Sequence, residues 1–100
     1  MRHHYIVAYD ICDPVRLRKV HRIVRDFGDG LQLSVFACQL TAIDRAVLEG
    51  RLLDVINQRE DQVLFVKLGQ VRENEAEDGP PRCNTLGRKL TPGFVRVVVC

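Results

Sequence analysis

The feature that most constrains this chain is the abrupt change of pattern at Asp13-Pro14. Before it, residues 4 to 11 (HYIVAYDI) are rich in Tyr, Ile and Val, which is typical of a mostly buried strand. At the change, an aspartate can cap a helix whose first position is a proline, where the missing N–H costs nothing. A strand that passes directly into a helix predicts an α/β fold, with Asp10 at the strand's end.

The helix after Pro14 is predicted to be amphipathic and to end at Gly28. Its apolar face is formed by Leu17, Val20, Val24 and Phe27. Five basic residues fall within ten positions, namely Arg16, Arg18, Lys19, Arg22 and Arg25. Such a stripe is typical of a solvated helix face, and it can also neutralise phosphates, so both interpretations stay open.

A second strand and a second helix are predicted after a turn at residues 28 to 30. Residues 31 to 39 alternate in polarity. The alternation puts Leu31, Leu33, Val35 and Ala37 on one side and Gln32, Ser34 and Phe36 on the other. Thr41 and Asp44 form a capping box for a helix over roughly 42 to 57. Its inward residues are predicted to be Leu48, Leu52, Val55 and Ile56, and Gly50 costs it about 1 kcal/mol relative to alanine.

Further strands are expected at 61 to 69, at 82 to 86 and at 93 to 100, with an acidic loop at 73 to 81. The last strand is strongly β-prone and is expected to pair, plausibly with a partner protomer. Taken literally, this order is β-α-β-α-β-β. We expect residues 1 to 100 to form one domain, an α/β sandwich with a mostly antiparallel sheet and two helices on one face.

The composition, with 46% hydrophobic and 28% charged residues and a net charge of +2, is that of an ordinary globule. No run of about 18 apolar residues could span a bilayer, and the N-terminus has no signal-peptide pattern. Widely spaced cysteines without a C-x-x-C pair predict free or buried thiols in a reducing cytoplasm. They are Cys12, Cys38, Cys83 and Cys100.

Tyr9-Asp10, followed by Asp13 and the basic helix, is the arrangement that most suggests chemistry, because α/β folds build sites at strand ends. A single carboxylate there can equally be a turn or cap acceptor. Asp13 is a cap on either interpretation. The residues alone therefore leave the role of Asp10 open.

A family resemblance runs from about residue 4 to 87. It is carried by Tyr9-Asp10-Ile11 with Asp13, by Arg16 and Lys19-Val20, by Gln32 with Ser34-Val35-Phe36, by Asp61 with Val63, and by Leu86-Gly87. With these residues the chain resembles the Cas-two family, the small CRISPR-associated endoribonuclease that partners the integrase in the spacer-acquisition complex. The resemblance implies a ferredoxin-like domain and a homodimer that exchanges its C-terminal strand.

The resemblance also implies a site. Asp10 and its symmetry mate would bind Mg²⁺ or Mn²⁺ for hydrolysis of a phosphodiester, with Tyr9 and Phe36 as further catalytic residues, although Phe36 can also be a core residue. Nucleic acid would be held by Arg16, Arg18, Lys19 and Arg22. The implied function is a homodimer that bridges the integrase subunit and binds duplex prespacer DNA, with cleavage of RNA or DNA as a second activity. The alternative is an RNA-cleaving toxin of the virulence-associated interferase type.

Two positions depart from the family's pattern. Gly30 stands where the family usually has an arginine, and Ala37 stands where it usually has an acidic residue. The departures favour the binding role over the nuclease role for this chain.

Overall fold

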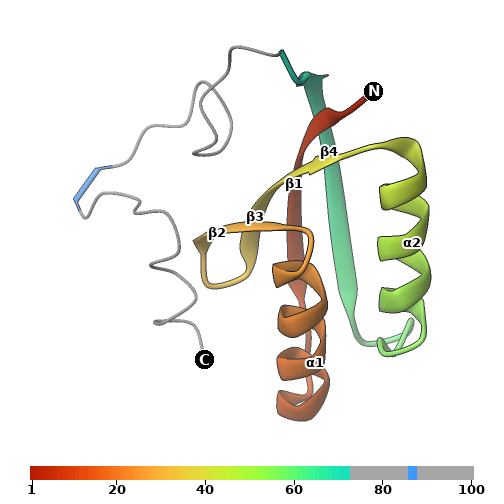
Figure 1. Ribbon diagram of the computed structural model, residues 1–100. Coiled ribbons are helices and arrows are strands. Elements are labelled where there is room, and N and C mark those ends of the chain that lie inside the picture. Colours follow the sequence, from red (N-terminus) through yellow and green to blue (C-terminus); the bar gives the residue numbers. More distant parts are fainter. Residues whose placement is uncertain (73–85, 88–100) are drawn as a thin grey trace.

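The computed structural model describes residues 1–72 and 86–87 of the chain. Its elements are β1 (His3–Asp10), α1 (Pro14–Arg25), β2 (Gly28–Gln32), β3 (Val35–Leu40), α2 (Ala42–Leu53) and β4 (Gln62–Gln70) (Figure 1). The strands form one antiparallel sheet in the order β2-β3-β1-β4. This β-α-β-β-α-β order confirms the ferredoxin-like α/β fold, whereas the literal order of elements read from the sequence is wrong.

The error lies in residues 28 to 40, which form a hairpin rather than a turn and one strand. Gly28 is the first residue of β2, and it packs against β3 so closely that an added Cβ would overlap the carbonyl oxygen of Ala37. The chain reverses around Leu33, which is 65% exposed. Within β3 the predicted alternation holds, because Phe36 lies on the opposite side to Val35 and Ala37. The side that faces the core carries Phe36, Cys38 and Leu40.

The first helix begins as predicted. The Asp13 carboxylate accepts a hydrogen bond from the backbone N–H of Arg16 at 2.9 Å, and Pro14 is the first helical residue. The helix ends at Arg25, before Gly28. Val20 and Val24 are buried as expected, but Leu17 is 40% exposed because it lines the pocket described below rather than the core.

The second helix has the predicted capping box. Thr41 accepts a hydrogen bond from the N–H of Asp44, and the Asp44 carboxylate accepts one from the N–H of Thr41. Leu48 and Leu52 are buried. The helix ends at Leu53, before the predicted end at 57. Val55 and Ile56 therefore follow the helix, and they pack on the core from the next segment.

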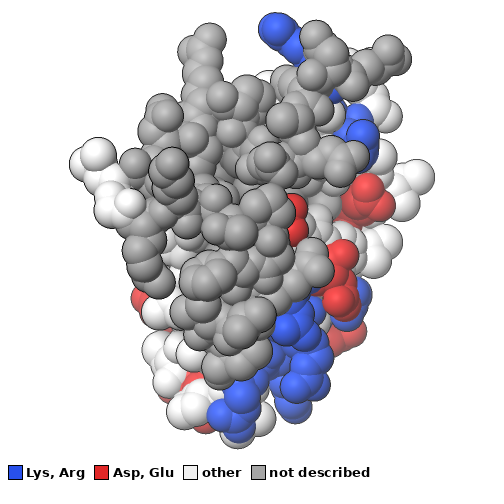
Figure 2. Space-filling model, turned by 60° about the vertical axis from the view of Figure 1, so that its left-hand side comes forward, with Lys and Arg blue, Asp and Glu red and all other residues white. Residues whose placement is uncertain are grey.

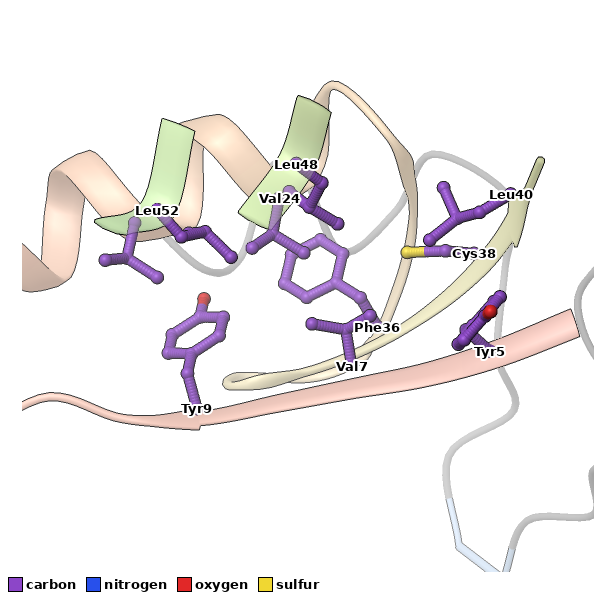
Figure 3. Packing of buried hydrophobic residues seen from close by; sticks show 10 residues of the cluster. Tyr5, Val7, Tyr9, Val24, Phe36, Cys38, Leu40, Leu48 and Leu52 are labelled. Atoms are coloured by element: carbon purple, nitrogen blue, oxygen red, sulfur yellow. The ribbon is translucent and has the colours of Figure 1, made fainter. Parts of the chain in front are cut away.

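The two faces of the sheet differ. Tyr5, Val7 and Tyr9 of β1 point toward the layer that holds α1 and α2 (Figure 3). The alternate residues of β1, ending with Asp10, point the other way. On that face Ile6 pairs with Val66 and Ala8 with Leu64 of β4. No described element packs on this second face, where Leu64 is 53% and Val66 39% exposed. The described residues therefore leave an apolar surface on this face of the sheet, and it ends at Asp10.

Several predictions fall outside the described residues. These are the acidic loop at 73 to 81, the strand at 82 to 86 except for its last residue, the exchanged strand at 93 to 100, and the thiols of Cys83 and Cys100. The two cysteines within the described part, Cys12 and Cys38, are free thiols as expected. No helix in the described ranges is long and apolar enough to cross a membrane.

Candidate functional site

Asp10 is the last residue of β1 and is exposed at the end of the open apolar face. Its neighbour in the sheet is Gln62, the first residue of β4. Within the described residues its carboxylate has no hydrogen-bond or ion-pair partner, whereas Asp13 caps α1. The alternative that Asp10 is a cap therefore does not hold, and no described residue occupies its carboxylate oxygens.

A pocket joins Asp10 to the basic face of α1. Its walls include Arg18, Arg22 and Arg25 from the helix and Leu33 from the hairpin turn. Among the described residues no carboxylate pairs with any of these three guanidinium groups. Figure 2 shows Lys and Arg side chains gathered at the lower end of the molecule, where Figure 1 places α1. Three cations that no described carboxylate pairs with, beside the single carboxylate of Asp10, make this pocket attractive to an anion.

Arg16 and Lys19, the other two residues predicted to hold nucleic acid, are not among the residues that line this pocket. Lys19 is exposed on α1. The Arg16 guanidinium forms a two-pronged ion pair with Asp61, with Nε 2.7 Å from Oδ2 and Nη2 3.2 Å from Oδ1, and it also contacts Glu60 at 3.1 Å. These hydrogen bonds hold the pKa of Asp61 well below its usual range, against the opposing effect of burial. The charge of Arg16 is thus matched within the protein, unlike that of the pocket arginines.

Tyr9 and Phe36, the two predicted catalytic aromatics, lie in the core with their rings stacked at 6.2 Å (Figure 3). The Tyr9 hydroxyl donates to the carbonyl oxygen of Leu33 at 3.3 Å and lies 2.9 Å from Nδ1 of His21. Burial raises the pKa of Tyr9 to about 12, so this hydroxyl stays protonated at neutral pH. Both rings lie on the helix side of β1, where Tyr9 holds the hairpin turn through Leu33 and lines the same pocket as Asp10, whereas Phe36 is not among the pocket residues.

His21 was missed in reading the sequence, although it lies on the buried side of α1 and lines the pocket. Its ring packs edge-on against Phe36 at 5.3 Å. Burial, and then the nearby charge of Arg25, lower the pKa of His21, which favours the neutral ring. The signal was present in the sequence, because His21 follows Leu17 by four positions and precedes Val24 by three.

A divalent cation fits this arrangement only in part. Among the described residues, no three His, Cys, Asp or Glu side chains come together as a metal site. Asp10 supplies one free carboxylate, the oxygen donor that Mg²⁺ and Mn²⁺ prefer, while Asp13 and Asp61 are engaged elsewhere. The described part of one chain thus offers a single free carboxylate to a cation at this place.

The fold and the pocket define a small ferredoxin-like α/β protein with a cationic hollow beside a carboxylate at a strand end. The family model for CRISPR associated protein Cas2 matches residues 1–76, and the chain belongs to this family. The CRISPR-associated endoribonuclease Cas2 of Geobacter sulfurreducens is 35% identical over 99 residues, which are 99% of each chain. The Rhodospirillum rubrum protein named CRISPR-associated endoribonuclease Cas2 1 is 38% identical over 86% of this chain and 79% of its own length.

Solved structures agree with this assignment. The crystal structure of Streptococcus pyogenes Cas2 at pH 6.5 superposes with a TM-score of 0.68 at 30% identity, over 84% of this chain and 99% of that one. A hypothetical protein from Thermus thermophilus superposes with a TM-score of 0.67 at 31% identity, over 80% and 96%. The predicted family and fold are confirmed.

Proposed function

We propose that this chain acts in CRISPR spacer acquisition, in the cytoplasm, as a homodimer that bridges the integrase subunit and binds duplex prespacer DNA through its phosphates. Metal-dependent cleavage of a phosphodiester at paired Asp10 carboxylates is the second activity. One observation carries the proposal: a carboxylate and three guanidinium groups, none of them paired with a described residue, share a pocket at the end of a sheet face on which no described element packs.

The open face supports the dimer. Leu64 and Val66 are too exposed for a sheet face that works alone in water, and large exposed apolar patches commonly mark interfaces. A two-fold interface uses the same patch on both copies. Because Asp10 lies on this same face, two sheets packed face to face would bring two Asp10 side chains to the interface.

The basic side of α1 supports binding of nucleic acid. Arg18 and Arg22 are exposed and point into one pocket with Arg25, so they can contact consecutive phosphates without reading bases. Contacts of this kind hold a duplex regardless of its sequence, which suits a protein that must accept DNA of any origin.

For the cleavage activity, the two Asp10 carboxylates would hold Mg²⁺ or Mn²⁺. The bound cation lowers the pKa of a water and neutralises charge on phosphate oxygens. Arg18 and Arg22 would place the phosphodiester beside Asp10, and the Tyr9–Leu33 hydrogen bond would keep the hairpin turn in position next to it.

The proposal is tested by separating binding from cleavage. Asp10→Asn should leave the dimer and duplex binding intact while abolishing Mg²⁺-dependent cleavage. The double substitution Arg18→Ala with Arg22→Ala should weaken duplex binding while the dimer persists. Arg51→Ala is the control, because it removes an arginine that does not line the pocket and is paired with Asp26.

Light scattering of the purified protein measures the mass, and co-purification with the integrase subunit measures bridging. A monomer at micromolar concentration would refute the paired site. Cleavage that survives Asp10→Asn would refute the catalytic role of this carboxylate. Duplex binding that is equal in the double variant and in Arg51→Ala would refute the phosphate-binding role of the pocket.

A further inference from the structure

We propose that Asp61 is a positioning residue for Asp10, acting together with Arg16. The buried Asp61 carboxylate ties together the loop that follows Asp10 and the loop that leads into the neighbouring strand. The Asp10 side chain is thereby held at one place on the sheet, where the second copy and a divalent cation can meet it. The inference rests on the proposed paired site and assigns a function to two residues outside it.

The Asp61 side chain has no solvent exposure, and every acceptor position on it is filled. Oδ1 accepts from the backbone N–H of Cys12 at 3.0 Å and from Nη2 of Arg16 at 3.2 Å. Oδ2 accepts from the backbone N–H of Asn57 at 2.9 Å and from Nε of Arg16 at 2.7 Å. One carboxylate thus fixes two backbone segments and one side chain.

One of those segments directly follows Asp10, and the other belongs to the loop that leads to the strand residue paired with it. Cys12 follows it by two residues in the β1–α1 loop, and its thiol also donates to the carbonyl oxygen of Glu60 at 3.0 Å. Asp61 directly precedes Gln62, the residue paired with Asp10 in the sheet. Within the described residues the Asp10 carboxylate makes no hydrogen bond of its own. Its position is therefore set by the backbone that Asp61 holds.

Arg16 is needed because a buried carboxylate requires a matched charge. Its planar guanidinium meets both oxygens of Asp61 at once, a geometry that the single ammonium of lysine does not reproduce. The ion pair with Asp61 therefore explains the basic residue at position 16, and no contact with a phosphate is needed to account for it. Glu60 takes only the exposed side of the same guanidinium and should matter little.

The test measures Mn²⁺ binding to the full-chain dimer by calorimetry, and amide hydrogen exchange at Ile11 and Cys12. Substitution of groups that orient a metal ligand typically weakens metal affinity about 10- to 100-fold. We expect a weakening in this range, together with faster exchange at both amides, for Asp61→Asn and more mildly for Arg16→Lys. Glu60→Gln is the matched control and should change neither measurement.

The variant Asp10→Asn distinguishes a failure of the positioning role from a failure of the paired metal site. If Asp10→Asn abolishes Mn²⁺ binding but Asp61→Asn and Arg16→Lys bind like the wild type, the positioning role is overturned and the proposed site stands. If Asp10→Asn has no effect on Mn²⁺ binding, the paired site is overturned, and the positioning role with it. Should Asp61→Asn fail to fold by circular dichroism, Arg16→Lys decides the question alone, because it keeps the charge and loses only the two-pronged geometry.

Discussion

Arg16 and Arg18 lie two positions apart on α1, yet they should contribute differently to binding of nucleic acid. The guanidinium of Arg16 is occupied by Asp61 and Glu60, whereas Arg18 and Arg22 line the pocket without an ion-pair partner among the described residues. Only a cation that neutralises a phosphate releases the counterion bound there, and this release makes binding depend on salt. The salt dependence therefore reports which arginines touch the duplex.

The magnitude follows from the number of contacts. Each phosphate contact contributes about 0.9 to the slope of log affinity against log salt concentration for B-form DNA. Replacing both Arg18 and Arg22 by alanine should lower the slope by about 1.8 for each protomer that contacts the duplex. Between 50 and 200 mM salt, the affinity of the double variant should therefore fall about 12-fold less than that of the wild type. Arg16→Gln, which keeps an N–H donor near Asp61, should leave the slope unchanged.

Fluorescence anisotropy with a labelled duplex, titrated at several salt concentrations, measures the slope directly. Each variant is first checked for the wild-type circular dichroism spectrum and dimer mass, so that unfolding is not mistaken for a lost contact. If Arg16→Gln lowers the slope as much as Arg18→Ala does, Arg16 contacts phosphate. The assignment of Arg16 to a purely internal ion pair would then be wrong.

Three further predictions concern stability and assembly. Gly28→Ala should destabilise the fold by about 1–3 kcal/mol, because the added methyl group would overlap β3. Gly50→Ala should stabilise it by about 0.5–1 kcal/mol, because a Cβ at that helical position would have nothing within 4 Å. Urea unfolding measures both changes. Val66→Asp should yield monomers by light scattering, because it places a charge on the open face; a stable dimer would exclude this face as the interface. The depressed pKa of Asp61 gives stability that is complete above its unfolded pKa of about 3.9 and is lost as the pH falls through the lower folded value. Melting temperatures between pH 5 and pH 2 should therefore fall less steeply for Asp61→Asn than for the wild type, and equal slopes would refute this ion pair as a source of acid sensitivity.

Local signals in the sequence were sufficient for the first strand and both helix starts. At Asp13-Pro14 and at the pair Thr41 and Asp44, the capping groups lie within four residues of each other. Each cap therefore forms from local contacts alone. The hairpin of β2 and β3 was not predictable in the same way. Gly28 looked like a helix stop and turn residue, and its reason for being glycine is a contact with Cys38, ten positions away.

The same distinction between local signals and distant contacts applies to the candidate site. Asp10 at the end of a strand and a basic stripe on the next helix are visible in the sequence, because both depend on the order of neighbouring residues. The sequence does not show which of those basic side chains are free. Arg16 is bound to Asp61, 45 positions away, while Arg18, Arg22 and Arg25 face a pocket.

The sequence by itself determined the α/β class, the caps and the acid at the strand's end, since each follows from patterns over a few adjacent residues, and its spaced motifs carried the family resemblance. Only the tertiary structure decided that Asp10 ends a sheet face on which no described element packs, that Phe36 lies in the core while Tyr9 joins the pocket of Asp10, and that Asp61 engages Arg16. The physical reason is that the availability of a charge depends on which distant groups folding places beside it.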